Sequence, residues 1–442
     1  MKYKAWKLAA IGSMFLSFFP TFGHGEIGSG QSHRFDPVIP GQFIVVTNDG
    51  FDPAQVASDH AAIPLHVYRV ASRGFAARLS NGQVNALRGD PRVNNVVADL
   101  KVTTAAKPGS GDGGTVETTP TGINRIDAEK AGASDAIVAI IDTGIDLDHP
   151  DLNVSTQCGF TAYNGTPDDG NGHGTHVAGT VGAKTNGTGV RGVAPGTELC
   201  PVKVLDNSGS GSWASVIAGI NYVTEKRTEG MNIKVANMSL GGCAVVSFIW
   251  CLAEAPPQND NCGVDPADDK VHDPLHKAIC DSTAAGVVYA VAAGNDGENA
   301  LYFVPAAYPE VVTVSALADY NGKGGGGTKP PRGCNYGPDD ALANFSNDGE
   351  AVDIAAPGAC ILSTYKGGGT KTLSGTSMAT PHVTGAIALA PLDLEAYSPR
   401  DAAMNALLPA PTACGFLGSF NDPDGVEEPV VYVGESDIAN CG

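Results

Sequence analysis

The sequence predicts an α/β protein with a mostly parallel central sheet covered by helices on both faces, preceded by a small α+β unit. From Gly122 onward, strand-like aliphatic runs alternate with helical stretches, the pattern of a parallel sheet built from β–α units. Residues 41–103, the short unit, hold their own mixture of strand-like and helix-like segments. Residues 104–120 lie between this short unit and the long unit; they lack apolar periodicity and are rich in Gly, Thr and Pro, as exposed linkers are.

The individual elements follow from the spacing of apolar residues. In the short unit we expect strands at 43–47, 74–79 and 95–97 and helices at 53–60 and 81–88. In the long unit we expect strands at 137–141, 202–205, 235–240 and 287–292 and helices at 173–183, 213–226 and 275–285. A further helix that starts at Ser377 should end near Leu389, because Pro391 cannot continue the helical hydrogen bonds.

Three segments fall outside this pattern. Residues 244–273 and 320–340 are expected to be inserted surface loops that decorate the long unit. Beyond Leu408 the tail follows no clear pattern, except that residues 429–433 are strand-like and are expected to pack on the edge of the long unit.

Length and charge limit the function. A chain of 442 residues is suited to two or three globular units. Its 47 acidic and 27 basic side chains give a formal net charge of −20, which argues against nucleic acid as a partner.

The first 23 residues are expected to be a secretory signal. Three lysines precede an apolar run over residues 8–19, which Pro20 breaks ahead of small residues. The run is short for a bilayer span and no later apolar stretch reaches ~18 residues. We therefore expect a secreted, extracellular protein without membrane contact; a retained anchor is the alternative.

Ten cysteines agree with export, because an even number in an oxidising compartment favours disulfides over buried free thiols. We expect bridges between cysteines that are neighbours in the sequence, such as Cys158/Cys200, Cys334/Cys360 and Cys414/Cys441.

Four residues in separate motifs combine into one kind of chemistry. Asp142 ends an aliphatic strand, His173 stands between glycines at a helix start, and Ser377 opens a helix. Each alone has an ordinary explanation as a turn, surface or capping residue. Together they supply a nucleophile, its base and the acid that orients the base, while Asn295 offers an N–H to a developing oxyanion.

The motifs VAIIDTGID, NGHGTHVAGTVGA, NMSLGG, AAGN and SGTSMATPHVTG occur in this order. They resemble the subtilisin-like serine proteases, or subtilases, over about Gly122 to Leu389, particularly the proteinase K-like branch and secreted bacterial members. The resemblance implies a three-layer subtilase fold and a serine endopeptidase of broad specificity that hydrolyses proteins through an acyl-enzyme. It also implies that Asp142 orients the base, His173 is the general base and acid, Ser377 is the nucleophile and Asn295 donates to the oxyanion.

The short unit resembles the subtilase propeptide in FIVVTNDG and in VYRVASRGFAARLSNGQVNALRGDPRVNNVVADLKV. This implies a ferredoxin-like domain that chaperones folding, inhibits the active site intramolecularly and is removed by self-cleavage. The expected organisation is a signal at 1–23, a propeptide at 24–105, a linker at 106–120, a catalytic domain at 121–408 and a packed extension at 409–442. We expect a monomer that acts on proteins and peptides.

The resemblance also assigns substrate contacts. An extended peptide is expected to pair with two edge strands, and small residues form the wall of the primary specificity pocket, beside an aromatic residue of a second, apolar pocket. The edge strands contain Gly209, Ser210 and Gly211 in one case and Ser239, Leu240 and Gly241 in the other. The pocket wall consists of Ala292, Ala293 and Gly294, and the aromatic residue is Trp213. Because this wall holds no acidic residue, we expect cleavage after large apolar or aromatic side chains.

A structural calcium ion is implied by the resemblance of AKTNGTGVRGVAP to the subtilisin calcium loop. Oxygen ligands on a loop suit calcium. The expected ligands are the side chains of Asp151 and Asn186 and the carbonyl groups of Lys184, Thr188 and Val190. Glu117 lies near the position of a further ligand, and Asp319 resembles a residue of a weaker second cation site.

Two other functions were weighed against the protease. His173 and His176 are spaced like a metal pair, but the Glu and spacing of the zinc protease motif HExxH are missing, so we expect no catalytic metal. A zinc-dependent hydrolase would lose activity to a chelator and keep it in Ser377→Ala. A catalytically dead, subtilase-like binding protein would show no turnover, and the four intact residues speak against it.

Overall fold

The computed structural model describes residues 37–104, 106–108, 116–243, 262–265, 268–408 and 428–434. The predicted signal, the pair Cys414/Cys441 and most of the insertion at 244–273 lie outside these ranges. Within the described residues, no helix is long and apolar enough to cross a membrane.

The short unit is an antiparallel sheet packed against two helices. Its elements are β1 (Val38–Thr47), α1 (Pro53–Asp59), β2 (Pro64–Tyr68), β3 (Gly74–Arg78), α2 (Asn81–Arg88) and β4 (Val93–Thr104), with strand order β4-β1-β3-β2. Both helices begin at a side-chain cap, Asp52 for α1 and a Ser80–Gln83 capping box for α2. This α+β arrangement confirms the expected fold of the unit.

The long unit contains the expected parallel sheet, in the order β17-β16-β14-β10-β6-β8-β7, with β18 pairing β16. All these pairs are parallel except β16–β17. The strands are β6 (Ile137–Asp142), β7 (Phe160–Thr161), β8 (Glu198–Lys203), β10 (Ile233–Met238), β14 (Val288–Ala292), β16 (Val312–Ala318), β17 (Ala341–Leu342) and β18 (Ile354–Pro357).

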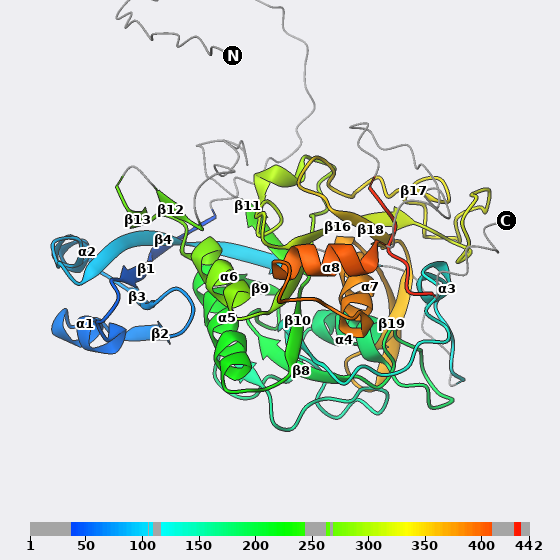
Figure 1. Cartoon of the computed structure of the whole chain (residues 1–442), viewed down its shortest axis with the longest axis horizontal. Helices are drawn as coiled ribbons and strands as arrows, with labels where there is room; N and C mark the ends of the chain where they lie inside the picture. Colours follow the sequence, from blue (N-terminus) through cyan, green and yellow to red (C-terminus); the bar gives the residue numbers. More distant parts are fainter. Residues whose placement is uncertain are drawn as a thin grey trace, which may run out of the picture. The chain divides into compact units, whose positions relative to one another are not determined.

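Helices cover both faces of this sheet (Figure 1). On β6, Val138 and Ile140 belong to the apolar cluster of α4 (His173–Gly182) and α7 (Thr376–Leu389). Ala139 and Ile141 belong to the cluster of α5 (Trp213–Thr228) and α6 (Pro274–Ala284). Alternation of buried residues along one strand is what a sheet buried on both faces requires.

The remaining elements lie around this core. They are α3 (Thr121–Arg125), α8 (Pro399–Leu407), a 3-10 turn at Ala300–Tyr302, β5 (Lys107–Pro108), β9 (Ser210–Ser212), β11 (Leu240–Cys243), β12 (Val264–Asp265), β13 (Lys270–Val271), β15 (Phe303–Val304), β19 (Ile361–Tyr365) and β20 (Gly369–Ser374). The strand expected at 235–240 is two strands, β10 and β11. They separate at Ser239, whose hydroxyl donates to the Ser377 carbonyl, after which β11 leaves the main sheet to pair with β4 and β15.

Two of the expected disulfides, Cys158–Cys200 and Cys334–Cys360, are present. A third disulfide, Cys262–Cys280, was not expected from the sequence. It joins the described part of the insertion at 244–273 to α6. Helix α7 ends at Leu389, as expected from Pro391.

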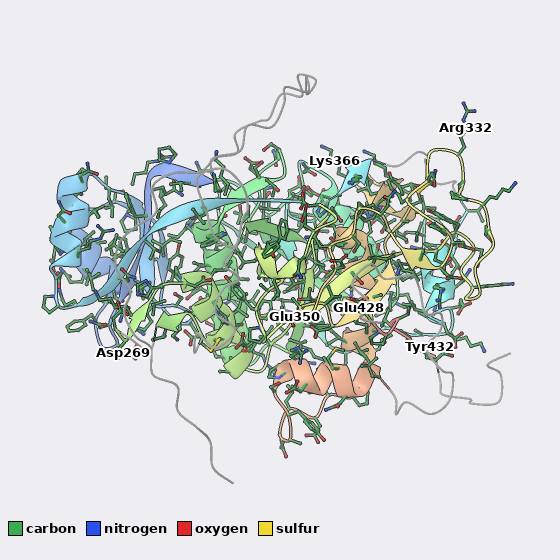
Figure 2. The ribbon with its side chains drawn as sticks, turned by 90° about the horizontal axis from the view of Figure 1, so that it is seen from above. Asp269, Arg332, Glu350, Lys366, Glu428 and Tyr432 are labelled. Carbon is green, nitrogen blue, oxygen red and sulfur yellow. A yellow bond between two sulfur atoms is a disulfide. The ribbon has the colours of Figure 1, made fainter. Side chains whose placement is uncertain are left out.

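The described part of the tail packs on β18, in agreement with the sequence. The Ala355 N–H donates to the Pro429 carbonyl at 2.8 Å, and the Val431 N–H donates to the Ala355 carbonyl at 2.9 Å. Tyr432, labelled in Figure 2, donates its hydroxyl to Asp127 at 2.8 Å. The contact is an isolated bridge and not a strand.

Two buried histidines in α4 and α7 make stability depend on pH. Burial lowers the pKa of His176 to about 3 and that of His382 to about 4. The unfolded chain binds a proton at each ring near pH 6.5, so it holds more protons than the folded chain between that pH and about 4. Stability should therefore fall as the pH is lowered through this window.

We predict that His382→Met reduces the slope of the unfolding free energy against pH by about 1.4 kcal/mol per pH unit between pH 4.5 and 6. The reason is that the unfolded variant binds one proton fewer in this range than the unfolded parent chain. Urea unfolding at several pH values, in chains that also carry Ser377→Ala to prevent self-cleavage, measures the slope. Ile387→Met, at another buried position of the same helix, is the packing control and should retain the parent slope. An unchanged slope in His382→Met would contradict the prediction.

Candidate active site

Asp142 and His173 come together because α4 begins where β6 ends, and Ser377, in the first turn of α7, is bonded to Ser239 directly after the neighbouring strand β10. The His173 Nδ1 atom lies 2.8 Å from Asp142 Oδ1 and 2.9 Å from Asp142 Oδ2. All three side chains are buried. Gly174 allows this approach, because a Cβ there would lie 2.1 Å from the Gly144 carbonyl oxygen and 3.2 Å from Asp142.

Asp169 holds the start of α4 in place and was not singled out in the sequence. Its Oδ1 accepts from Gly172 N–H at 2.8 Å, and its Oδ2 accepts from Thr175 N–H at 2.9 Å and from the Thr175 hydroxyl at 2.6 Å. It also accepts from the Thr143 hydroxyl at 2.9 Å, next to Asp142. The signal available was its position a few residues before a helix start, where acidic capping residues are favoured.

Ser377 is buried and bonded to Ser239. Its Oγ donates to the Ser239 carbonyl at 3.1 Å, while the Ser239 hydroxyl donates to the Ser377 carbonyl at 2.9 Å. His173 Nε2 has no hydrogen-bond partner among the described residues. Proton transfer from Ser377 to His173 therefore requires the serine hydroxyl to turn away from Ser239.

Asn295 is oriented by the residue that precedes Ser377. Its Oδ1 accepts from the Thr376 N–H at 2.8 Å and from the Thr376 hydroxyl at 3.0 Å. The Thr376 hydroxyl also accepts from Gly294 N–H at 3.2 Å. These bonds engage the amide oxygen, so the NH2 group of Asn295 points the other way.

The loop that carries Asn295 is held by Asn347, a second residue that the sequence did not reveal. Asn347 is fully buried; its Nδ2 donates to the Ala293 carbonyl at 2.9 Å, and its Oδ1 accepts from Asp296 N–H at 3.0 Å and Glu298 N–H at 3.1 Å. Such side-chain bonds to a loop backbone fix its conformation.

The two edge strands expected to bind substrate instead pair with β4 of the same chain. Lys101, Val102 and Thr103 lie opposite Ser212, Gly211 and Ser210 of β9. Thr103 and Thr104 lie opposite Gly241 and Leu240 of β11, and Thr104 N–H donates to the Gly209 carbonyl at 3.0 Å. Figure 1 shows β4 extending from the short unit to β9 and β11.

The residues expected to line the two specificity pockets are buried near β4 and at the end of β14. Val102 is 1% exposed and belongs to the same apolar cluster as Trp213. Ala292 and Ala293 are buried at the end of β14, with Gly294 next to them. After residue 105 the chain pairs again, with Lys107 opposite Ser374 of β20.

The expected calcium ligands gather around Asp151. Its carboxylate accepts from Val190 N–H at 3.0 Å and from Asn186 Nδ2 at 2.9 Å, and burial raises its pKa. No described residue donates a hydrogen bond to the carbonyl groups of Lys184, Thr188 or Val190. This oxygen-rich set fits a hard cation such as calcium, provided that the Asn186 amide turns its oxygen toward Asp151.

The residues of the other cation sites weighed in the sequence have protein partners. Asp319 is paired with a buried arginine: Arg125 Nε lies 2.9 Å from Asp319 Oδ2 and 3.2 Å from Asp340 Oδ1. The Arg125 guanidinium thus supplies the positive charge at the position of the expected second cation. His176 Nε2 faces the carbonyls of Ile361 and Lys371, each at 3.0 Å, while His173 faces Asp142, so the two rings have different partners.

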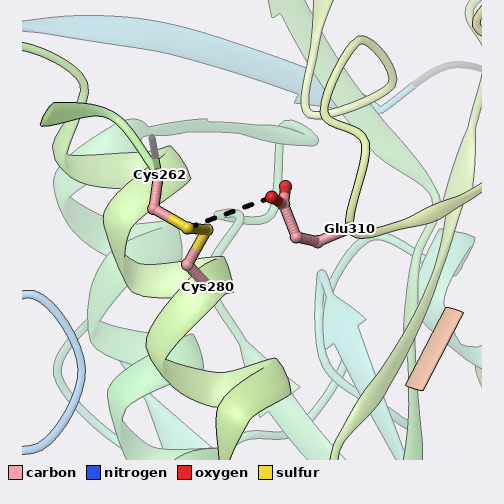
Figure 3. Close-up of side chains that lie close together, drawn as sticks. All are labelled: Cys262, Cys280 and Glu310. Carbon is pink, nitrogen blue, oxygen red and sulfur yellow. Dashed lines mark hydrogen bonds between the residues drawn. A yellow bond between two sulfur atoms is a disulfide. The ribbon is translucent and has the colours of Figure 1, made fainter. Parts of the chain in front are cut away.

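One further group of possible ligands in the described residues consists of Cys262, Cys280 and Glu310 (Figure 3). The two sulfur atoms form a disulfide and so are not thiolate ligands. Because a disulfide sulfur carries no hydrogen, the 3.9 Å approach of Cys262 Sγ to Glu310 is a packing contact.

Comparisons with known proteins agree with this geometry. The Subtilase family model matches residues 133–412, and the Peptidase inhibitor I9 model matches residues 43–105. The subtilisin-like serine protease AsES of Sarocladium strictum is 38% identical over 334 residues, covering 73% of this chain and 71% of that protein. Proteinase R of Parengyodontium album is 33% identical over 324 residues, covering 72% and 70%. An alkaline protease of Shouchella clausii is 36% identical over 320 residues, covering 71% and 68%.

A crystal structure of a cold adapted subtilisin-like serine proteinase superposes with a TM-score of 0.51 at 28% identity, covering 71% of this chain and 98% of that one. The family model spans more than half of the chain, and the inhibitor model covers the short unit whose last strand lies between β9 and β11. The chain therefore belongs to the subtilase family and is a serine-type endopeptidase with an amino-terminal inhibitor I9 propeptide.

Proposed function

We propose that this chain is a secreted zymogen that hydrolyses proteins through Asp142, His173 and Ser377. The observation that carries the proposal is the buried contact of His173 Nδ1 with both Asp142 oxygens, at 2.8 and 2.9 Å. Ser377 lies at the start of α7, which packs against α4, the helix that carries His173. An imidazole held by a carboxylate through Nδ1 leaves Nε2 to accept a proton from the serine.

The proposed reaction has two steps. Ser377 Oγ attacks the peptide carbonyl carbon as His173 Nε2 takes its proton, and the new oxyanion accepts from the Ser377 backbone N–H and the Asn295 amide. Breaking the C–N bond, with the proton passed from His173 to the leaving amine, gives an acyl-enzyme. Water, deprotonated by His173, then releases the acid and restores Ser377. Asp142 remains ionised and stabilises the imidazolium in both steps.

We propose that the chain's own first substrate is the Ala105–Ala106 bond. Thr104 lies opposite Leu240, the neighbour of Ser239, to which Ser377 is bonded. Lys107 lies opposite Ser374, three residues before Ser377. The cleaved bond therefore belongs between Thr104 and Lys107. The propeptide would end at residue 105 and remain in the cleft as a product-like inhibitor, with residues 106–120 trimmed afterwards.

Broad specificity with a preference for large apolar side chains is proposed for the pocket walled by Ala292, Ala293 and Gly294. Its residues are small and uncharged, and the burial of Val102 in the apolar cluster that includes Trp213 supports a second apolar pocket. Secretion is supported by the amino-terminal signal pattern and by the disulfides. A relative from Thermus is named an extracellular serine proteinase. The mature enzyme is proposed to act as a monomer.

The first prediction concerns the nucleophile. Wild-type precursor should lose residues up to 105 and digest casein, whereas Ser377→Ala should do neither, because the acyl-enzyme cannot form. Intact mass and casein cleavage measure both properties. Equal processing and cleavage in the two chains would show that Ser377 is not the nucleophile.

The second prediction concerns Thr376 as a positioning residue for Asn295. Thr376→Val removes the hydroxyl bonded to Asn295 and Gly294, so kcat should fall about tenfold with little change in KM, because an oxyanion contact is made in the transition state. Thr376→Ser should restore kcat. Thr380→Val, which loses only a hydroxyl bonded to the Thr376 carbonyl, is the matched control. A rise in KM alone would contradict this role.

The third prediction concerns calcium, which we propose binds at Asp151, Asn186 and the loop carbonyls and stabilises the fold. At a calcium concentration one hundred times the Kd, binding contributes about 2.7 kcal/mol, so EGTA should lower the Tm of Ser377→Ala by about 3 °C. Asp151→Asn should remove most of this difference, and Asp148→Asn, an exposed acid on the same segment, should retain it. An EGTA-insensitive Tm would contradict calcium binding.

A further inference from the structure

The described part of the 244–273 insertion does more than decorate the surface. Strands β12 and β13 form a hairpin in which Val264 lies opposite Val271 and Asp265 lies opposite Lys270. β13 contacts β4, the propeptide strand that continues into the active site. Figure 1 places the hairpin beside this strand, and Asp269 of the hairpin lies next to the propeptide elements in Figure 2.

Two asparagine side chains of the propeptide bind the hairpin backbone. Asn94 Oδ1 accepts from Val271 N–H at 2.7 Å, and Asn95 Nδ2 donates to the Val271 carbonyl at 3.1 Å. Asn94 Nδ2 also donates to the Asp269 carbonyl at 3.4 Å. Val271 is only 7% exposed. Both outward-facing backbone groups of this buried edge residue thus have their partners in the propeptide, and such groups are costly to leave unpaired.

The hairpin is fixed to a helix that already holds the propeptide. The Cys262–Cys280 disulfide ties its base to α6 (Figure 3). The Gly263 carbonyl, on a residue with φ +78°, accepts from His272 N–H at 2.8 Å. On the same helix, directly after Cys280, Asp281 accepts from the propeptide's Ser72 N–H at 3.0 Å. The hairpin contact is therefore continuous with an interface that exists without it.

The rest of that interface lies on α5. Asn221 Oδ1 accepts from three successive propeptide N–H groups, those of Arg69, Val70 and Ala71, at 2.8–3.2 Å. Asp99 accepts from Ala214 N–H at 3.0 Å, at the first turn of α5. The hairpin adds a third point of attachment, at Asn94 and Asn95 near the beginning of β4.

We propose that the β12–β13 hairpin is a clamp for the chain's own propeptide. It recognises the adjacent amides of Asn94 and Asn95, which match the N–H and C=O of Val271, and it slows release of the propeptide after the cut. The clamp rests on the proposed function, in which the propeptide stays bound as an inhibitor once the Ala105–Ala106 bond is broken. A protein substrate without paired asparagines at this distance from the cleaved bond is not retained by the hairpin.

The contact itself can be tested without catalysis. In full-length Ser377→Ala, hydrogen exchange followed by mass spectrometry should show Val271 N–H exchanging at least tenfold faster when Asn94→Ala and Asn95→Ala are combined, because its acceptor is lost. Asn48→Ala is the control: Asn48 bonds Asn94 at 3.2 Å within the propeptide but does not touch the hairpin. Equal protection in the double variant and its parent would overturn the contact.

The clamp function is tested in the active chain. After self-cleavage, protease activity should emerge about tenfold sooner in the Asn94→Ala, Asn95→Ala chain than in wild type, and at the wild-type time in Asn48→Ala. Replacing Cys262 and Cys280 by serine should also shorten the time before protease activity emerges. Because both pairs of substitutions act through the hairpin, combining all four should shorten this time by less than the product of the two separate fold-changes.

Two outcomes separate the clamp from the function on which it rests. A chain that cuts itself and becomes active with the same delay in wild type and in the asparagine variant overturns the clamp alone. A chain that neither cuts itself nor digests casein overturns the proposed function, while the exchange experiment still reports on the hairpin contact.

Discussion

The close packing of α4 and α7 on one face of the parallel sheet determines where every site residue lies. Both helices also lie close to segments outside this sheet: a Cβ at Gly179 of α4 would come within 2.1 Å of the Thr364 hydroxyl on β19, and a Cβ at Gly385 of α7 would come within 2.6 Å of Val193. Only small residues permit these distances. Because both helices begin at the edge where β6 ends, His173 and Ser377 reach the carboxyl end of the strand that carries Asp142.

The same edge explains how the chain inhibits itself. β9 and β11 offer unpaired backbone groups to an extended peptide, and an exposed strand edge recruits any strand of suitable register. β4 occupies this position as a substrate would, so the hydrogen bonds proposed to hold a substrate also hold the propeptide. Contacts outside β9 and β11, at α5, α6 and the β12–β13 hairpin, add to the attachment of the propeptide.

Several carboxylates of this acidic protein lie directly beside a positively charged or hydrogen-bonding partner. Asp142 is buried against the His173 ring, and Asp319 and Asp340 are buried against Arg125. Asp151 lies in a loop whose free carbonyl groups add further negative potential, which is why a calcium ion is the expected partner there. Buried carboxylates are retained where a positively charged or hydrogen-bonding partner is built beside them.

Much of this protein was determined by local sequence. Alternating apolar runs predict the sheet and its helices, the capping residues place α1 and α2, and Pro391 ends α7, because periodicity and backbone chemistry act over a few residues. The short motifs likewise single out Asp142, His173, Ser377 and Asn295 as the proposed catalytic residues. Only the tertiary structure decided the rest. The roles of Asp169 and Asn347, the pairing of Arg125 with Asp319, the Cys262–Cys280 bridge and the hairpin contact with Asn94 and Asn95 join residues whose partners are set by how separate elements pack. No local pattern encodes these contacts, since each depends on the distance between elements far apart in the chain.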